Sequence, residues 1–264
     1  MDRIVAIASG KGGVGKSTVA ANLATSLANY GVDGKPLRVA LVDVDFYGPS
    51  IPTLMGGGEI QPDHEGKIVP ALKHGVKYIS ISFFLKNPDD AVVWRGPMFG
   101  KAIGQLFQDV NWGDVDICLV DMPPGTGDAQ LSLSQMLTLD GAVLVTTPQE
   151  VALTDVRRAV NMFRQVSVEP LGVVENMGPM TLPNGETLEL FGKGGGEALA
   201  EQYGVPFYGT VPIDISVRQG GDTGQPAALD KESPIGQQFQ AIAEKLWRSI
   251  EDRRASATRL NIVN

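Results

Sequence analysis

The chain of 264 residues is 43% hydrophobic, which is enough to build the core of one large α/β domain or of two small ones. Its formal net charge of −8 argues against a general nucleic-acid-binding protein, and no apolar run approaches the roughly 20 residues of a membrane span. Cys118 is the only cysteine, which excludes an intrachain disulfide, and neither a linker nor a signal peptide is evident, so we expect one cytoplasmic domain over residues 1–264.

An apolar strand over residues 4–8 leads directly into the segment GKGGVGKST, which precedes an alanine-rich helical pattern. The spacing of Gly10 from Gly15-Lys16-Ser17 is that of a P-loop, in which consecutive backbone N–H groups wrap phosphate oxygens. We predict that Lys16 lies against the β- and γ-phosphates of ATP and that the Ser17 hydroxyl binds Mg²⁺. The residues expected to contact the nucleotide here are Gly10, Lys11, Gly12, Gly13, Val14, Gly15, Lys16, Ser17 and Thr18.

The same segment also satisfies the dinucleotide-binding pattern G-x-G-x-x-G through Gly10, Gly12 and Gly15. A dinucleotide site expects an acidic residue about twenty positions further on, and it has no use for Lys and Ser at the helix start. The first strand-end acid, Asp43, comes later, so a triphosphate site is favoured over a dinucleotide site or a structural turn. Lys11 is a second lysine in this loop, either a solvated charge or a further phosphate ligand.

A helix and a buried strand are predicted next. Apolar and small residues recur every four positions from Val19 to Ala28, which predicts a helix that ends at Gly31 and packs closely on a sheet. Residues 37–42 form a nearly continuous apolar run, which is typical of a parallel strand covered on both faces.

The region after this strand is rich in Gly and Pro. Residues 46–66 predict a long loop beside the P-loop. Residues 67–71 and 76–82 predict a short hairpin, and residues 94–97 predict a turn that leads into a helix over residues 98–109.

Four more apolar strands are predicted in the second half of the chain, each followed by polar residues. They are residues 117–120, 142–145, 171–174 and 207–211. Strands that alternate with helices predict an α/β fold, a mostly parallel sheet with helices on both faces, and such sheets bind ligands at the carboxyl ends of their strands. The strand-end side chains expected to converge beside the P-loop are Asp43, Asp121, Thr146 and Asn176.

Three strand-end acids are candidates for metal binding and catalysis. Asp121 precedes the glycine-rich residues 122–127 and is predicted to hold Mg²⁺ through water, with this segment placed to sense the γ-phosphate. Asp43 and Asp45 lie on the same side of one strand end, because side chains alternate, so one can support the metal while the other orients the attacking water. The alternative is that these aspartates only form turns or cap a helix.

The ends of the last two strands offer candidates for contact with the nucleotide base. An amide both donates and accepts hydrogen bonds, so Asn176 suits the edge of adenine, and the alternative is a turn residue. Pro212 and Asp214 follow the last strand and are the other candidates for binding the nucleotide.

Three further features have structural interpretations. The second glycine-rich segment, residues 192–196, lacks a following Lys-Ser and is expected to open a helix rather than to bind phosphate. Cys118 lies in a buried strand pattern and is expected to be a packed thiol. An apolar helical stripe from Phe239 to Ile250 is expected to dock on the domain rather than on a membrane.

Several motifs outside the P-loop resemble those of one family. They are VDVDFYGPSIP at residues 42–52, WRGPM at 94–98, VDMPPGTGDAQL at 120–131, TTPQEVAL at 146–153, VVENM at 173–177 and the segment from FGKGGG to VPID at 191–214. On these residues the chain closely resembles the Mrp family of ATPases, the ApbC-like iron–sulfur cluster carriers, which share a lysine-bearing P-loop with MinD, ParA and ArsA. The resemblance covers most of the chain and implies a P-loop NTPase fold of the MinD and ParA class, with ATP hydrolysis that is slow without a partner.

The resemblance also implies roles for individual residues. Lys11 would reach the nucleotide of a partner subunit in a homodimer, Asp45 would act on the hydrolytic water, and Asn176 would contact adenine. The residues expected to act in catalysis are then Lys11, Lys16 and Asp45. Those expected to bind the metal are Ser17, Asp43 and Asp121, and the cofactors implied are ATP and Mg²⁺.

The function implied is iron–sulfur cluster or metallocofactor maturation, with a scaffold or apoprotein clients as partners. Cluster-carrying relatives have Cys-x-x-Cys after the motif that matches residues 173–177, whereas residues 178–185 contain no cysteine. A bridging four-iron cluster needs about four thiolates, so we expect this chain to hold no stable iron–sulfur cluster. The alternative is a MinD- or ParA-like positioning switch that binds a membrane or DNA, for which Arg253, Arg254 and Arg259 would supply the basic end.

Overall fold

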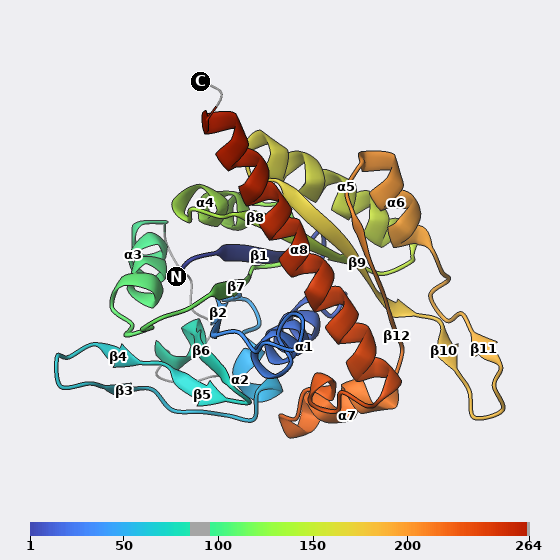
Figure 1. Cartoon of the computed structure of the whole chain (residues 1–264), viewed down its shortest axis with the longest axis horizontal. Coiled ribbons are helices and arrows are strands. Elements are labelled where there is room, and N and C mark those ends of the chain that lie inside the picture. The colour runs from blue at the N-terminus through green and yellow to red at the C-terminus, as the bar shows by residue number, and fades with distance from the viewer. Residues whose placement is uncertain (85–95, 263–264) are drawn as a thin grey trace.

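The central sheet has eight strands in the order β12-β9-β8-β1-β7-β2-β6-β5 (Figure 1). The computed structural model describes residues 1–84 and 96–262. Neighbouring strands of this sheet are parallel, except that β5 is antiparallel to β6. Helices cover both faces, so the mostly parallel α/β sheet predicted from the sequence is confirmed.

The strands of the sheet are mostly runs of buried aliphatic side chains, as parallel strands covered on both faces require. They are β1 (Ile4–Ser9), β2 (Val39–Asp43), β5 (Ala71–Lys73), β6 (Val76–Ser80), β7 (Ile117–Asp121), β8 (Gly141–Thr146), β9 (Pro170–Gly178) and β12 (Phe207–Pro212). Two short antiparallel pairs lie outside the sheet, namely β3 (Gln61–Pro62) with β4 (Ile68–Val69) and β10 (Met180–Thr181) with β11 (Thr187–Leu188).

The helices form two layers around the two hydrophobic cores. One layer contains α1 (Lys16–Asn29), α2 (Ile51–Leu54), α7 (Ile215–Thr223), the short turn η2 (Ala227–Leu229) and α8 (Pro234–Ile262). The other contains α3 (Gly96–Gln108), α4 (Asp128–Met136), α5 (Glu150–Gln165) and α6 (Gly195–Tyr203). The short turn η1 (Ile81–Phe84) follows β6.

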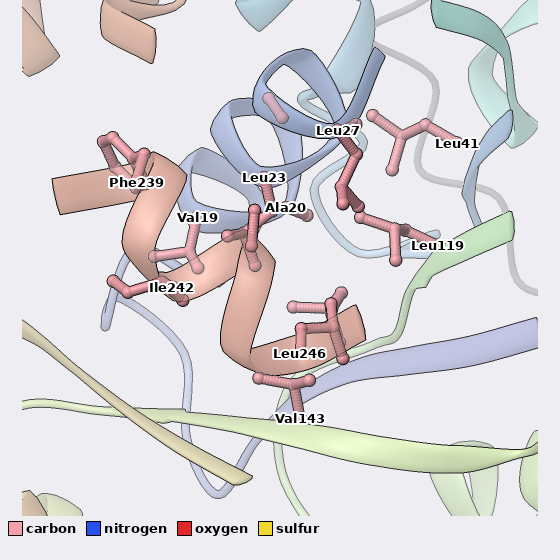
Figure 2. Close-up of a cluster of buried hydrophobic side chains, with 14 of the residues drawn as sticks. Val19, Ala20, Leu23, Leu27, Leu41, Leu119, Val143, Phe239, Ile242 and Leu246 are labelled. Carbon is pink, nitrogen blue, oxygen red and sulfur yellow. The ribbon is translucent and has the colours of Figure 1, made fainter. Parts of the chain in front are cut away.

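Helix α1, which follows the P-loop, is clamped between the sheet and α8. Figure 2 shows side chains of α1 and α8 packed together over the strands, and those labelled on the two helices are Val19, Ala20, Leu23, Leu27, Phe239, Ile242 and Leu246. All of them are fully buried, and each large aliphatic one stabilises the fold by about 1.5–3 kcal/mol. The position of the P-loop is therefore fixed by a core that lies behind it.

The apolar stripe of α8 is docked on the domain, as predicted, and does not face outward. At its basic end, Arg253 lies 3.7 Å from Glu169 and Arg254 lies 3.3 Å from Asp140, while the side chain of Arg259 lies outside those that the structure describes. Within the described residues, no helix combines the length and the hydropathy needed to cross a membrane. These ion pairs weaken the interpretation of this end as a basic membrane contact.

The predicted hairpin over residues 67–71 and 76–82 is wrong in its first strand. The observed hairpin joins β5 to β6 through His74 and Gly75, whose positive φ angles of 50° and 79° suit a tight hairpin turn. Residues 68–69 pair instead with β3. Pro70 separates the two segments because it has no N–H group to donate to a ladder.

Three other boundaries differ from the sequence-based prediction. The predicted loop over residues 46–66 contains α2, which begins with Pro52 in its first turn. Of the turn predicted at residues 94–97, the first two lie outside the described residues and the last two already belong to α3. Strand β9 continues to Gly178, so Asn176 lies inside a strand rather than after it.

Candidate functional site

The P-loop folds between β1 and α1 in a conformation that only glycine permits at its end. Gly15 has φ of +79°, and a Cβ atom there would lie 2.2 Å from the side-chain nitrogen of Asn176. Gly10 is needed for a different reason, since its Cβ would lie 2.2 Å from the backbone of Asp155 in α5. The loop is thus held against β9 on one side and α5 on the other.

Lys16 points into a buried cluster of acids. Its Nζ lies 2.6 Å from Oδ1 of Asp121 and 3.4 Å from Oδ2 of Asp45, and it donates to the Ser17 hydroxyl at 3.2 Å. The side chain is 5% exposed. Burial by itself lowers the pKa of Lys16, but the charges of Asp121 and Asp45 outweigh burial and raise it, so the ammonium stays protonated.

Asp43 and Asp121 lie side by side, because they are partners in the register of β2 and β7. Burial, with the neighbouring charge of Asp121, raises the pKa of Asp43 to about 8 against the opposing effect of Lys16. Burial also raises the pKa of Asp121, and Lys16 opposes it. The site therefore brings together carboxyl groups whose ionised forms are unfavourable unless a cation lies beside them.

The hydrogen bonds distinguish these two acids as metal ligands. Asp43 accepts from the Ser80 hydroxyl at 2.9 Å and from the backbone of Asp45 and Ile51 at 3.1 and 3.3 Å, which occupies both of its oxygens. Oδ2 of Asp121 is buried and, among the described residues, has no hydrogen-bond partner, although Ser17 lies near enough to lower its pKa. Asp121 is the acid with an oxygen free for a cation.

The donor set fits Mg²⁺ bound together with phosphate. Hydroxyl and carboxylate oxygens are what Mg²⁺ prefers, and it takes one or two protein carboxylates while keeping water and phosphate ligands. The described residues hold no group of three or more His, Cys, Asp or Glu side chains arranged to bind a metal alone. A cation held by Ser17 and Asp121 would therefore need oxygen atoms from a bound phosphate or from water.

Two cavities meet at the P-loop. The smaller, of about 250 Å³, is lined by loop residues that include Lys11, Lys16 and Ser17 and by Asp45. The larger, of about 470 Å³, is lined by Asn176 and by the residues after β12. Three residues line both cavities, namely Gly15, Thr18 and Ser50. The arrangement suits a ligand with a phosphate chain at one end and a larger, flatter group at the other.

The larger cavity is lined by Asn176, which was predicted to contact the base, and by two other residues predicted to bind the nucleotide. Asn176 donates from Nδ2 to the carbonyl of Val14 at 2.8 Å, which ties β9 to the P-loop. Pro212 and Asp214 line the same cavity, and Asp214 also caps α7 by accepting from the backbone of Ser216 at 2.7 Å. Asn176, Pro212 and Asp214 therefore lie at one pocket.

The glycine-rich segment after Asp121 lies against the P-loop. The backbone N–H of Gly125 donates to the carbonyl of Ser9 at 3.0 Å, and Pro124 lines the smaller cavity. Lys11 lines that cavity as well and is half-buried. Thr146 is buried and donates to the carbonyl of Thr147 at 3.1 Å, so its hydroxyl serves the local backbone.

The second glycine-rich segment opens α6, as predicted. Glu175 of β9 is fully buried and accepts from the backbone of Gly196 at 2.7 Å and of Gly194 at 3.2 Å. Its carboxylate therefore occupies the positive end of this helix, where a phosphate would otherwise bind. Glu175 also accepts from the Thr210 hydroxyl at 3.2 Å and so joins β9, β12 and α6 directly behind Asn176.

Ser80 is a site residue that the sequence analysis missed. It is buried at the carboxyl end of β6, and its hydroxyl both donates to Asp43 and accepts from the Ser82 hydroxyl at 2.9 Å. Ser80 could have been predicted from the sequence as Asp43 was, because it is a polar residue at the end of an apolar strand. It was obscured because the predicted strand extended past residue 80.

Several known proteins are similar to this chain in sequence and structure. The model of the ParA family, described as NUBPL iron-transfer P-loop NTPase, matches residues 1–247. An iron-sulfur cluster carrier protein from Synechocystis sp. is 46% identical over 252 residues, which cover 92% of this chain and 69% of the relative. A nucleotide-binding protein from Archaeoglobus fulgidus in complex with ADP has a TM-score of 0.75 at 38% identity, and the match covers 86% of this chain and 88% of that one. The septum site-determining protein MinD from Pyrococcus horikoshii, complexed with Mg-ADP, has a TM-score of 0.66 at 26% identity, and the match covers 93% of this chain and 96% of that one.

Proposed function

This chain belongs to the ParA family of NUBPL-type iron-transfer P-loop NTPases, and on that premise we propose that it binds ATP with Mg²⁺ at the P-loop and hydrolyses it. The observation that carries the proposal is the buried Lys16, held between Asp121 and Asp45 at the wall of a cavity that the P-loop lines. The relatives solved with ADP and Mg-ADP support the same class of ligand.

Lys16 is the group that would bind the terminal phosphates. Its ammonium has three donors, which now serve carboxylate and hydroxyl oxygens within 3.4 Å. Phosphate oxygens are also anionic hydrogen-bond acceptors, so a bound triphosphate can take over these bonds from Asp121. The start of α1 contributes backbone N–H groups and carries no acidic residue in its first turn, which favours an anion there.

Ser17 and Asp121 would hold the metal, with Asp43 behind them. Mg²⁺ bound there would supply positive charge that neutralises the phosphates during transfer. Once Lys16 turns to phosphate, the charge of Asp121 needs another cation, and Oδ2 is the oxygen available to it. Asp43 orients the backbone at Asp45 and at the start of α2 through its three hydrogen bonds, and we assign it a supporting role at the metal.

Asp45 is the candidate that orients the attacking water. It lines the smaller cavity and is 7% exposed, so its carboxylate reaches the cavity while most of it is held in place. Oδ1 accepts from the backbone of Tyr47 at 3.2 Å, which leaves Oδ2 directed toward Lys16. A carboxylate fixed beside the phosphate site can hold a water for in-line attack and accept its proton.

The active form that we propose is a homodimer with nucleotide near the interface. Lys11 supports this proposal, because the P-loop already has Lys16 for the phosphates, and Lys11 lines the same cavity while it is only half-buried. A closed two-fold assembly would bring the Lys11 of each subunit to the nucleotide of the other.

The process that we propose for this ATPase is iron–sulfur cluster maturation, in which the cluster is cargo and apoproteins or a scaffold are partners. The names of the relatives support this role. The residues of this chain do not fit a cluster of its own, since Cys118 is fully buried in β7 and burial raises the pKa of its thiol to about 12. No step of cluster transfer is therefore assigned to its side chains.

Calorimetry with ATP and Mg²⁺ tests the nucleotide site. We expect saturable binding by the wild type, and a loss of at least about a hundredfold in Lys16→Ala, because a charge-assisted contact to phosphate is removed. Lys193→Ala is the matched control, since Lys193 lies in the other glycine-rich segment and pairs with Glu189 at 2.6 Å. Equal affinity in the wild type and Lys16→Ala would refute the assignment.

A further inference from the structure

A groove of about 720 Å³ lies between the β10–β11 hairpin, the end of β12 and the start of α8. Figure 1 shows this hairpin projecting from the body of the molecule beyond the end of β9. The groove is lined by residues 180–183, by residues 212–215 and by Pro234 and Ile235 of α8. Nothing in the proposed ATPase mechanism uses the hairpin.

The shape of the groove suits an extended chain. Each of two walls of the groove is formed by four consecutive residues, 180–183 and 212–215, so the groove runs along the backbone of both segments. Met180 and Thr181 belong to β10 and Pro212 ends β12, whereas the other residues lie in the hairpin turn and around the start of α7. Among the residues that the structure describes, the two-residue strand β10 has a strand neighbour, β11, on one side only, which leaves its other edge open to an added strand.

Large apolar side chains are exposed at and beside this groove. Ile215, which lines it, is 58% exposed, and Leu190 beyond β11 is 57% exposed. Met180 and Leu182 add apolar surface on the hairpin side. Clustered exposed side chains of this kind mark an interaction site more often than an ordinary surface.

The charged side chains on the segments that form this groove are all acidic. Residues 178–191, 210–216 and 234–238, which form its walls and the hairpin, contain Glu186, Glu189 and Asp214 and no Lys or Arg. The nearest following base, Lys193, is paired with Glu189. A partner that brings lysine or arginine to this rim would be favoured by charge complementarity.

We propose that this groove binds an extended segment of a partner protein in which apolar residues alternate with basic ones. The apolar side chains lie against Ile215, Leu182 and Ile235, the peptide groups pair with the edge of β10, and the basic side chains face Asp214 and Glu186. Residues 212–214 line both this groove and the larger nucleotide cavity, so the partner segment lies directly beside the nucleotide site. The inference does not depend on ATP hydrolysis.

Fluorescence anisotropy with a labelled peptide of alternating Val and Lys tests the groove. We expect saturable binding by the wild type and binding weakened about tenfold in Ile215→Ser, because burial of one aliphatic side chain is lost. Leu72→Ser is the matched control, since Leu72 is 64% exposed on β5 at the opposite edge of the sheet. A peptide of alternating Val and Glu should bind more weakly than the Val and Lys peptide.

Three results would overturn the proposal. They are absence of binding by the wild type, equal binding by the wild type and Ile215→Ser, and equal affinity for the acidic and basic peptides. Self-association of the wild type that Ile215→Ser abolishes would assign the groove to a second copy of this chain and would also contradict it. Calorimetry with ATP on each variant keeps this outcome separate from failure of the nucleotide site, and hydrogen exchange should slow at residues 180–183 when the peptide binds.

Discussion

The Nζ atom of Lys16 lies 2.6 Å from Oδ1 of Asp121, and the two side chains are 5% and 0% exposed. Ion pairs buried to this degree stabilise a fold little in total, because the loss of hydration offsets their attraction. Removal of one partner is different, since it leaves an unpaired charge in the interior. Substitutions at Lys16 or Asp121 should therefore change the stability of the fold as well as nucleotide binding.

The first prediction concerns stability. Lys16→Ala should lower the free energy of unfolding by about 3–5 kcal/mol, because Asp121 and Asp45 lose their cation. The double variant Lys16→Met with Asp121→Asn should recover part of this loss, since both charges of the closest pair are removed and only Asp45 is left without its cation, but neither variant should bind ATP. Urea denaturation and calorimetry measure both properties. A single variant as stable as the wild type would show that the pair is not buried as described.

The second prediction concerns pH. Asp43 keeps its proton to a higher pH in the folded chain than in the unfolded one, because burial and Asp121 raise its pKa from 3.8 to about 8. Its contribution to stability is therefore full below its ordinary pKa and is lost as pH rises through the folded value. Relative to Asp43→Asn, the wild type should lose stability between about pH 4 and 8, by at most about 1.4 kcal/mol per pH unit.

Denaturation curves recorded in EDTA at several pH values measure this difference without a bound cation. A difference between the wild type and Asp43→Asn that stays constant over this range contradicts the raised pKa. A difference that grows in favour of the wild type as pH rises would mean that the pKa is lowered instead.

The third prediction separates hydrolysis from binding. Asp45→Asn should hydrolyse ATP at least about a hundredfold more slowly, because a positioned base contributes this much or more. Its affinity for ATP should stay near that of the wild type, since Asp45 is not a phosphate donor. Single-turnover assays and calorimetry give the two numbers, and Asp114→Asn, an 87% exposed aspartate paired with Arg38, is the control. Undiminished hydrolysis in Asp45→Asn would remove it from the mechanism.

The fourth prediction tests the homodimer. Lys11→Ala and Lys16→Ala subunits should each be inactive alone, and an equal mixture should regain about a quarter of the wild-type ATPase activity. Random pairing makes half of the dimers mixed, and one of the two shared sites in each is intact. No recovery in the mixture, together with a monomeric mass by light scattering in ATP, would rule out the shared site.

The fifth prediction is that the chain holds no stable iron–sulfur cluster. Residues 178–185 contain no cysteine, and the fully buried Cys118 is the only thiol of the chain. After anaerobic reconstitution with iron and sulfide and desalting, we expect no charge-transfer absorption and little iron. Near-stoichiometric iron that survives Cys118→Ser would show that other ligands suffice. The native thiol should also resist alkylation at pH 8 until the protein is unfolded.

Much of the nucleotide site could be predicted from the sequence because its signals are local. The strand, the glycine loop and the helix start that form a P-loop are contiguous, and glycine is required wherever side chains would block phosphate or demand a forbidden φ angle. Apolar runs that end in Asp43 and Asp121 mark strand ends, and the parallel arrangement brings such ends to one edge. The docked face of α8 could also be predicted, because its apolar residues recur with the period of a helix.

What the tertiary structure decided is how these groups pair. Lys16 and Asp121 are separated by 105 positions, and only the register of β1, β2 and β7 brings the ammonium to one carboxylate oxygen and leaves the other free. The register of β2 and β6 brings the hydroxyl of Ser80 to Asp43, from a strand whose end the sequence pattern misplaced. The sequence indicates which side chains are polar at a strand end, but their charge, proton and partner depend on burial, and burial is a property of the whole packed chain.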